Sequence, residues 1–378
     1  MEQRSGSTPA LDPLPPRGRA RVGAKERLMN VTETPTFHST PSQARKPDLR
    51  PLVDSFGRVH TSLRISVTDR CNIRCFYCMP LEDVRFLPRA EILSFEEITR
   101  FARIAAGMGV RKLRLTGGEP LVRAELPTLV ASLAAIDGID DLALTTNGIL
   151  LADQALALRD AGLRRLNISL DTLSEATFQR ISRREGIDRV LDGIEAAQRA
   201  GFDAIRLNAV AIRGITEDDI VPLAGFARDR ALELRFIEYM PLDAEGKWDT
   251  NQVLSGAKIR ERLETEFGPL VAARRDDPSQ PALDFEFADG IGRIGFINPV
   301  TQPFCGDCNR LRLTAEGQIR NCLFSTVEWD ARAPLRSGGS DEELEQLVRD
   351  CVAAKKPGHG IDSPDFLRPQ RAMYQIGG

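Results

Sequence analysis

The sequence predicts an α/β protein built on an incomplete, six-stranded (βα)6 TIM-like barrel, followed by a C-terminal region that adds further strands. Between residues 63 and 240, short β-like runs alternate with segments of helical periodicity, which is typical of βα units and a parallel sheet. Six such units can be counted, fewer than the eight of a closed barrel.

The expected elements follow one another along the chain. Strands are expected at residues 62–68, 111–116, 141–146, 165–170, 204–211 and 232–239. Helices are expected at residues 94–108, 152–161, 187–200 and 216–230, with a further helix at 342–354.

Several expected strands alternate apolar and polar residues, although a parallel strand covered on both faces should be almost wholly apolar. We expect the apolar faces, such as Leu63 and Ile65, to meet outer helices, and the polar faces to line an inner space. That space would hold basic side chains suited to phosphate oxygens: Arg64, Lys112, Arg114 and Arg206. A half-exposed antiparallel sheet alternates in the same way, but helices of ten or more residues between the strands disfavour it.

Composition limits the class of protein. The 378 residues are 42% apolar and 28% charged, with a formal net charge of -3, as in a globular protein with no global attraction to nucleic acid or acidic membranes. No apolar run approaches the ~20 residues of a membrane span, and no secretory signal is recognisable. We expect a cytoplasmic protein that binds neither nucleic acid nor membrane.

Three parts are expected along the chain. Residues 1–48 are rich in Pro, Ser, Thr and Arg and indicate a disordered extension, with Met29 as an alternative start. Acidic residues in this stretch argue against a transit peptide. Residues 49–245 would form the partial barrel, and residues 246–378 a second region.

Three of the seven cysteines, Cys71, Cys75 and Cys78, have the spacing C-x3-C-x2-C directly after the first expected strand. Such a loop can ligate three irons of a 4Fe-4S cluster and leave the fourth open, whereas electron carriers and structural zinc sites use four protein ligands. A zinc site completed by a distant side chain is the alternative. Cys351, within the last expected helix, is predicted to be a small buried residue.

A glycine pair follows the second expected strand, in the segment Gly117-Gly118-Glu119-Pro120. Paired glycines allow close backbone approach to a ligand, and the proline suits the entrance to a helix. Taken alone, the segment is equally compatible with an ordinary strand-to-helix turn.

A second cysteine triad, Cys305, Cys308 and Cys322, has the spacing C-x2-C-x13-C. An incomplete zinc ribbon and an electron-relay cluster with an outside ligand are alternatives to a substrate-binding cluster. Arg310 and Arg312 follow on one face of an expected strand, which suits a polyphosphate, although a solvated edge strand would tolerate them too.

The chain ends in Gly377 and Gly378, and terminal glycines are usually frayed. A glycine tail is also thin enough to enter an active site without side-chain obstruction.

The first cysteine loop, with Tyr77 between its last two cysteines, resembles the signature of the radical S-adenosylmethionine (radical SAM) enzymes. The resemblance implies that S-adenosylmethionine chelates the open iron and is cleaved by one electron to a 5′-deoxyadenosyl radical. It also implies four contacts to S-adenosylmethionine: Tyr77 at the adenine, Gly118 at the methionine amino group, and Ser169 and Met240 nearby.

Over roughly residues 51–378, the two triads, the Gly-Gly-Glu-Pro turn, the arginine pair and the glycine tail together resemble the GTP 3′,8-cyclase family of molybdenum cofactor biosynthesis. The resemblance implies two [4Fe-4S] clusters, the second of which holds guanine. The radical would take the ribose 3′ hydrogen of GTP, and C3′ would then attack C8. The implied catalytic and substrate contacts are Arg64, Lys112, Arg114, Thr145, Arg206, Arg310, Arg312, Gly377 and Gly378, with Arg206 where the family commonly has lysine.

The resemblance further implies partners: a reduced electron donor of the flavodoxin or ferredoxin type, and the next enzyme of the pathway, cyclic pyranopterin monophosphate synthase. The resemblance is also compatible with a homodimer. Two other functions fit the residues less well, namely a radical enzyme with an auxiliary cluster that acts on a peptide or another small molecule, and a non-catalytic metal scaffold.

Overall fold

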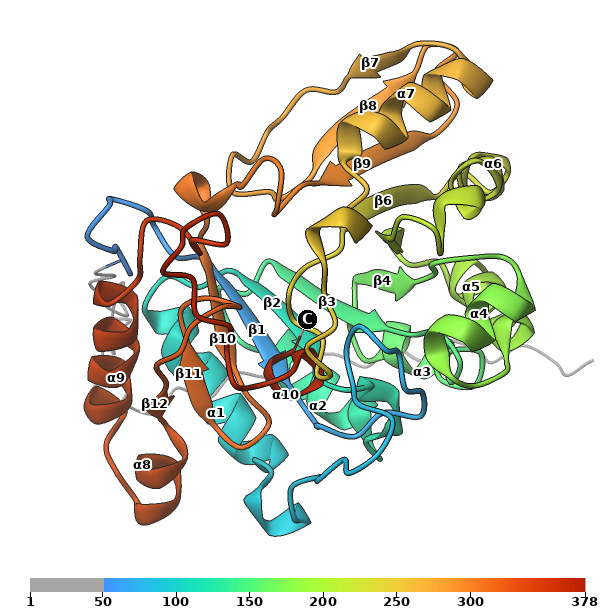
Figure 1. The fold of residues 1–378 in the computed structure, drawn as a ribbon. Helices are drawn as coiled ribbons and strands as arrows, with labels where there is room; N and C mark the ends of the chain where they lie inside the picture. Colours follow the sequence, from blue (N-terminus) through green and yellow to red (C-terminus); the bar gives the residue numbers. More distant parts are fainter. Residues whose placement is uncertain (1–50, 378) are drawn as a thin grey trace, which may run out of the picture. The chain divides into compact units, whose positions relative to one another are not determined.

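The structure is a computed structural model that describes residues 51–377, and these residues belong to one compact unit (Figure 1). The expected extension over residues 1–48 and the alternative start at Met29 lie outside the described residues. So does Gly378.

One sheet of 12 strands runs through the described residues, in the order β12-β11-β10-β1-β2-β3-β4-β5-β6-β9-β8-β7. The strands are β1 (Ser62–Ser66), β2 (Lys112–Thr116), β3 (Asp141–Thr146), β4 (Arg165–Ser169), β5 (Ala204–Ala211), β6 (Glu233–Glu238), β7 (Leu270–Ala272), β8 (Leu283–Phe287), β9 (Arg293–Ile297), β10 (Arg310–Leu313), β11 (Gln318–Arg320) and β12 (Trp329–Asp330).

The helices are α1 (Phe95–Gly107), α2 (Leu126–Ala134), α3 (Ala155–Asp160), α4 (Glu175–Ser182), α5 (Ile187–Ala200), α6 (Ile220–Asp229), α7 (Gly256–Phe267), α8 (Arg332–Ser337), α9 (Asp341–Ala353) and α10 (Met373–Ile376). Five short 3-10 turns, η1 to η5, lie at Arg89–Glu91, Pro120–Val122, Glu217–Asp219, Thr250–Gln252 and Cys305–Asp307.

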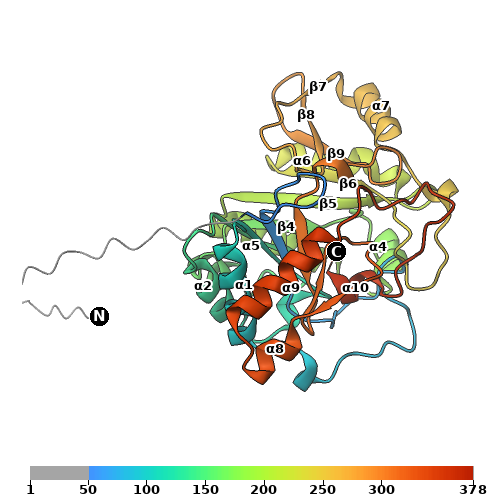
Figure 2. The same cartoon turned by 90° about the vertical axis from the view of Figure 1, so that its left-hand side faces the viewer.

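The expected strands are confirmed to within two residues at either end. β1 to β6 are neighbours in sequence order and all pair in parallel, so the antiparallel alternative is wrong. The sheet does not stop at six strands, because β10 pairs in parallel with β1 and β9 with β6. The extra C-terminal strands thus extend both edges of the parallel sheet, and β7–β8 with α7 stand at one edge while α8 and α9 stand near the other (Figures 1 and 2).

The expected helices are also present, with α1, α5 and α9 within one or two residues of their predicted bounds. α1 begins at a capping box, in which Ser94 accepts a hydrogen bond from the backbone of Glu97 and Glu97 accepts one from the backbone of Ser94. Cys351 is fully buried within α9, as predicted.

The core lies between the sheet and its helices. Leu63, Ile65, Leu113 and Leu115 are at most 1% exposed and share one cluster with apolar side chains of α1, α2, α5 and α6. Because successive side chains of a strand alternate, the arginines of the same strands must face the other side. The predicted apolar face toward the helices is therefore confirmed, and the polar side chains lie on the opposite face of the sheet. That this polar face lines an inner space stays a prediction.

The expected boundary near residue 245 stays a prediction, and the sheet crosses it, since β9 and β10 join strands that precede it. Within residues 51–377, no helix has both the length and the apolar character needed to cross a membrane.

Candidate active site

The two cysteine triads lie at opposite ends of the parallel strands. Cys71 follows the carboxyl end of β1, whereas Cys308 precedes the amino end of β10, and the two strands run in parallel with Ser62 opposite Arg310. A five-residue strand spans about 17 Å. The polar faces of these strands therefore run from one triad toward the other.

Hydrogen bonds to α4 fix the first cysteine loop. The backbone N–H groups of Arg74 and Phe76 donate to the carbonyl oxygens of Ser182 and Ile181, at 2.8 and 3.1 Å. Within the loop, the N–H groups of Cys78 and Met79 both donate to the carbonyl oxygen of Cys75, at 2.9 Å. The loop therefore turns back on itself at the second cysteine.

Burial keeps these thiols protonated in the ligand-free chain. It raises the pKa of Cys71 to about 11, and it raises the pKa of Cys75 and of Cys78 as well, with a neighbouring cysteine as a further cause for these two. A donor set of three adjacent thiols fits a cluster with one open iron, and binding would release their protons. Among residues 51–377 no three His, Cys, Asp or Glu side chains are already arranged to hold a metal ion, so ligation remains a proposal.

The glycine pair after β2 packs against the cysteine loop itself. The N–H of Gly118 donates to the carbonyl oxygen of Thr68 at 2.8 Å, and a Cβ at Gly118 would lie 2.3 Å from the carbonyl oxygen of Arg70. Gly117 has a φ of +138°, and a Cβ there would lie 2.3 Å from the Thr68 oxygen. The close approach expected for a ligand is therefore made by the chain's own backbone.

Glu119 of the same turn is buried, and both of its carboxylate oxygens accept hydrogen bonds. Its carboxylate accepts hydrogen bonds from the N–H of Asn147 at 2.7 Å, from the hydroxyl of Thr146 at 2.8 Å and from the N–H of Leu121 at 3.0 Å. Burial raises the pKa of Glu119 to about 7, although these bonds lower it. The Asn147 side chain in turn donates to Asn72 beside Cys71, at 2.7 Å.

The expected S-adenosylmethionine contacts gather at the carboxyl edge of the sheet. The Tyr77 hydroxyl donates to Asp171 at 2.6 Å, and burial raises the pKa of Asp171 to about 6. Ser169 ends β4, and half-buried Met240 follows β6. Sequence reasoning assigned no role to Asp171 or Asn147, although a polar residue within two positions of the end of a parallel strand is a signal that could have found both.

Three arginines stand side by side across the strands. Arg64 on β1 pairs in register with Arg312 on β10 and with Arg114 on β2. Within residues 51–377, the side chains of Arg64 and Arg114 form no hydrogen bond and no ion pair. Burial lowers the pKa of both guanidinium groups, and neighbouring arginines lower it further.

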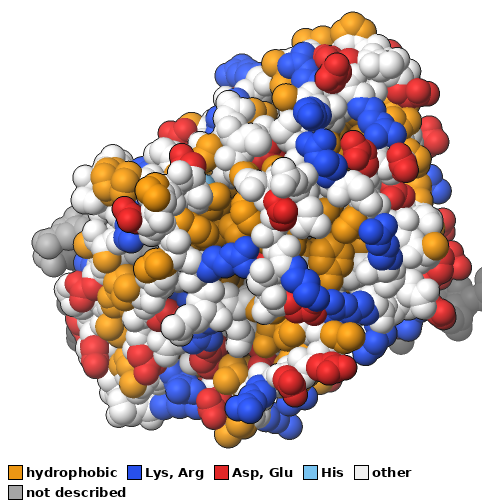
Figure 3. Space-filling model, in the orientation of Figure 1, with side chains coloured by type: hydrophobic (Ala, Val, Ile, Leu, Met, Phe, Trp, Pro, Cys, Tyr) orange, Lys and Arg blue, Asp and Glu red, His pale blue; other side chains and the backbone are white. Residues whose placement is uncertain are grey.

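Such an arrangement is costly without an anion, because like charges are held together in buried or partly buried positions. A polyphosphate would offset both the burial and the repulsion. The cluster is a local feature, since acidic and basic side chains are intermixed on the face shown in Figure 3.

Lys112, Arg206 and Thr145 differ from these arginines. Lys112 donates to Asp277 at 2.5 Å, and Arg206 donates to Glu233 at 2.8 Å. Half-buried Thr145 lies on β3 opposite Asn167. Both basic side chains already have an acidic partner, so they are weaker candidates for phosphate contacts than Arg64 and Arg114.

In the second triad, two cationic side chains contact the thiol of one cysteine, Cys308. Arg310 donates to the sulfur of Cys308 from two nitrogens, at 3.2 and 3.3 Å, and Lys355 does so at 3.5 Å. Burial raises the pKa of Cys308, but the charges of Arg310 and Lys355 outweigh it and bring the pKa to about 6. Sequence reasoning missed Lys355, which is buried just after α9 and there resembles an ordinary basic helix end.

The tail reaches the arginine row. Arg312 donates to the carbonyl oxygen of Gly377, which is buried, so at this residue the chain is not a frayed end. A Cβ at Gly377 would lie 2.4 Å from the hydroxyl oxygen of Ser66 on β1. Gly378 lies outside the described residues.

Two family descriptions match the chain. Residues 65–227 match the Radical SAM superfamily, and residues 232–361 match Molybdenum Cofactor Synthesis C. Among solved structures, SuiB of Streptococcus suis bound to S-adenosylmethionine is similar, with a TM-score of 0.56 and 14% identity over 82% of this chain and 67% of that chain. At this identity the likeness shows the fold alone.

Curated relatives are much more similar. The GTP 3′,8-cyclase of Rhodopirellula baltica is 56% identical over 330 residues, covering 86% of this chain and 92% of that protein. The enzymes of the same name from Pelotomaculum thermopropionicum and Corynebacterium glutamicum are 45% and 42% identical, over 86% and 97% of this chain and 100% and 98% of those proteins.

The fold, the first cysteine loop and these matches define a radical SAM enzyme. Within that class, the chain belongs to the GTP 3′,8-cyclase family.

Proposed function

We propose that this protein cyclises GTP to (8S)-3′,8-cyclo-7,8-dihydroguanosine 5′-triphosphate, the first step of molybdenum cofactor biosynthesis. One observation carries the proposal beyond family membership: Arg64 and Arg114 are half-buried cations whose side chains form no hydrogen bond or ion pair among the described residues, on strands that run between two cysteine triads. A triphosphate would supply negative charge to these two guanidinium groups.

Cys71, Cys75 and Cys78 would hold one [4Fe-4S] cluster, and Cys305, Cys308 and Cys322 a second. When bound, the first cluster and S-adenosylmethionine supply a 5′-deoxyadenosyl radical. Tyr77, Gly118, Ser169 and Met240 would surround S-adenosylmethionine at the carboxyl edge of the sheet. The second triad would hold guanine at the opposite end.

The chain's own contribution is to fix the ribose. A carbon radical takes whichever hydrogen is held near it, so the 3′ hydrogen of GTP must be presented and others kept away. Arg64, Arg114, Arg310 and Arg312 would hold the triphosphate and ribose, and Gly377 and Gly378 would close the site beside them. Lys112, Thr145 and Arg206 would act at its margin.

We further propose that β1 to β6 form the wall of a partial barrel and that residues 246–378 cover its open side. The electron would come from a reduced protein of the flavodoxin or ferredoxin type. In this assignment the enzyme works in the cytoplasm and passes its product to cyclic pyranopterin monophosphate synthase.

The decisive experiment uses anaerobically reconstituted full-length protein with S-adenosylmethionine, dithionite and GTP deuterated at C3′. The expected result is a cyclised nucleotide together with 5′-deoxyadenosine that carries the deuterium. Cleavage of S-adenosylmethionine without cyclised nucleotide or deuterium transfer would contradict the assignment. GTP deuterated at C2′ is the matched control and should transfer no label.

A further inference from the structure

The segment before β1 folds back on itself and presents Arg58 to the second cysteine loop. The N–H of His60 donates to the carbonyl oxygen of Leu52 at 2.7 Å, and Val53 forms an antiparallel bridge with Val59. Arg58 lies directly before Val59 and is only 8% exposed. A long cation in this position needs partners, because its burial is costly.

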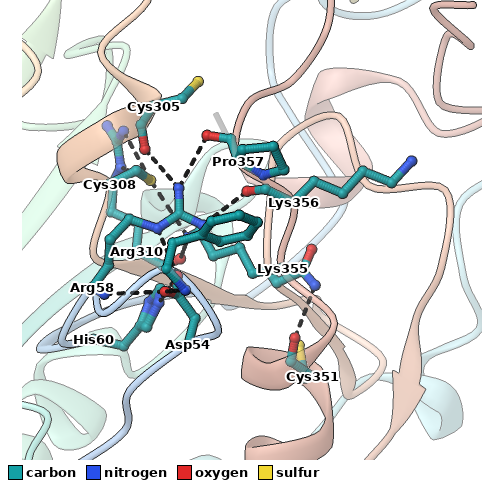
Figure 4. A network of polar contacts seen from close by, with 12 residues as sticks. Asp54, Arg58, His60, Cys305, Cys308, Arg310, Cys351, Lys355, Lys356 and Pro357 are labelled. Carbon is teal, nitrogen blue, oxygen red and sulfur yellow. Dashed lines mark hydrogen bonds and ion pairs between the residues drawn. The ribbon is translucent and has the colours of Figure 1, made fainter.

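Arg58 finds its partners in two separate segments (Figure 4). One guanidinium nitrogen donates to the carbonyl oxygens of Cys305 at 2.7 Å and Pro357 at 3.2 Å. The other terminal nitrogen donates to the carbonyl oxygen of Lys356 at 2.8 Å. The planar fork of arginine can make these bonds together, whereas the single ammonium of lysine cannot match the same directions.

Asp54 orients the guanidinium from behind. Its carboxylate accepts hydrogen bonds from Arg58 Nε at 2.6 Å, from His60 Nε2 at 3.0 Å and from the backbone of Phe56 at 2.9 Å. Burial opposes ionisation, but the bonds from His60 and Arg58 outweigh it and lower the pKa of Asp54 to about 2. The carboxylate is therefore charged at neutral pH and holds Arg58 in one orientation.

Both segments held by Arg58 lead directly to the second triad. Cys305 is itself a member, and residue 356 follows Lys355. Lys355 donates to the sulfur of Cys308 at 3.5 Å and to the carbonyl oxygen of Arg310 at 2.9 Å. Arg58 thus ties the loop that carries two of the three cysteines to the segment that carries their buried cation.

We propose that Arg58 is a positioning residue of the second iron-sulfur site, which fixes Lys355 against Cys308 by joining Cys305 to residues 356 and 357. This inference rests on the proposed function. Hydrogen bonds and charges at ligand sulfurs tune a cluster and orient its ligands. Loss of Arg58 should therefore change the second cluster and its handling of GTP, while the first cluster, at the other end of the strands, is spared.

The test compares Arg58→Lys, Arg58→Ala and Asp54→Asn with the parent as reconstituted holoenzymes. We expect the ratio of cyclised nucleotide to 5′-deoxyadenosine to fall at least about tenfold, while S-adenosylmethionine cleavage without GTP stays within about twofold. A second readout is the electron paramagnetic resonance spectrum of the second cluster, with and without GTP, in protein whose Cys71, Cys75 and Cys78 are changed to Ser. This spectrum should differ between Arg58→Lys and parent.

Arg100 provides the matched control. It also joins two segments, donating to Asp341 at 2.7 and 2.9 Å and to the carbonyl oxygen of Gly339 at 2.6 Å, but it does so between α1 and the start of α9. Arg100→Lys and Arg100→Ala should leave the product ratio and the spectrum unchanged.

An unchanged ratio and spectrum in the Arg58 variants would overturn the inference. If Arg58→Ala does not fold, Arg58→Lys and Asp54→Asn decide, and loss of both clusters in these two would also overturn it, because it would show a general scaffold role. A parent that forms no cyclised nucleotide would contradict the proposed function instead, and the spectra would still test Arg58.

Discussion

The guanidinium of Arg312 on β10 donates a hydrogen bond to the backbone carbonyl oxygen of Gly377, near the end of the chain. This contact ties the tail to the row of arginines that includes Arg64. It also leaves no room for a side chain, since a Cβ at Gly377 would lie 2.4 Å from Ser66 Oγ and 2.7 Å from Thr116 Cγ2. The residue has a φ of +69°, which disfavours any substitution.

Gly377→Ala should therefore displace the tail without unfolding the protein. We expect cyclised nucleotide to fall by at least about tenfold, or ~1.4 kcal/mol in barrier, with little change in melting temperature or in iron content. Turnover with GTP and differential scanning calorimetry measure the two effects. Deletion of Gly377 and Gly378 should have the same signature.

Gly360→Ala is the matched control for this prediction. Gly360 also has a φ of +69°, but the nearest atom to its added Cβ is Ser363 Cβ at 3.8 Å. The Gly360→Ala variant therefore has the same backbone strain as Gly377→Ala but no steric crowding of the added methyl group. Equal turnover in Gly377→Ala and parent would show that the tail plays no part in the reaction.

Arg64→Ala and Arg114→Ala should weaken GTP binding while sparing or even raising the stability of the GTP-free protein. Each change removes charge-assisted hydrogen bonds worth about 1.5 to 3 kcal/mol, which corresponds to roughly tenfold or more in Kd. Each also removes a half-buried cation that repels its neighbours. Calorimetric titration with GTP tests the expected loss of affinity, and melting temperatures without GTP test the expected stability.

Arg206→Lys is the control, because Arg206 is already paired with Glu233 and the change keeps the charge. It should shift GTP affinity only slightly. A melting temperature that drops sharply in both alanine variants would mean that Arg64 and Arg114 stabilise the GTP-free fold and do not serve as an anion site.

The two cysteine triads should have separable functions. Changing Cys71, Cys75 or Cys78 to Ser should abolish reductive cleavage of S-adenosylmethionine. Changing Cys305, Cys308 or Cys322 should preserve some cleavage but eliminate cyclised nucleotide, and should halve the iron from about eight to about four per chain, the count expected for one four-iron cluster. Iron analysis and product chromatography measure both outcomes.

Cys351→Ala tests whether the effect belongs to the triads. Cys351 is a fully buried core residue of α9, so its loss should cost only modest stability and no iron. Zinc at the second site, or about four irons in the parent, would contradict the two-cluster assignment.

Much of this fold is readable from the sequence because its signals are local. The six parallel strands, α1, α5 and α9 follow from periodicity, and the inward arginines follow from alternation, as at Arg64 between the buried Leu63 and Ile65. The triads and the glycine tail are short motifs that can be recognised in the sequence without any knowledge of packing. The pairing of β9 with β6 and β10 with β1 joins residues far apart in sequence, and no local pattern encodes it.

The contacts that support the site were missed for the same reason. Position 118 requires glycine because the backbone of Arg70, 48 positions earlier in the chain, lies against it. Lys355 is part of the site because its ammonium group contacts the sulfur of Cys308. Arg58 reads as a surface charge until its three carbonyl partners are known. Long-range contacts of this kind have no signature in a single sequence.

His60 should make the stability of the protein fall as the pH drops from about 6.5 to about 4. The ring is fully buried. Burial, together with the charge of Lys355, lowers the pKa of His60 from 6.5 to about 4, although the neighbouring Asp54 raises it. Below pH 6.5 the unfolded chain therefore binds a proton that the folded chain does not. The resulting loss of folding free energy reaches about 3 kcal/mol near pH 4. Asp54 has a folded pKa of about 2, below its usual 3.8, so the stability that its ionised form provides is lost only below about pH 4.

His60→Gln removes this titration and keeps a side-chain amide that can donate to Asp54. The variant should be less stable than the parent at pH 7, because the packed ring is lost, and the gap should narrow steadily between pH 6.5 and 4. Melting temperatures of the GTP-free protein at half-unit steps of pH measure the gap. Because every other titrating group is common to both proteins, the difference between the two curves isolates His60. Parallel curves across this range would show that the imidazole is free to charge in the folded state.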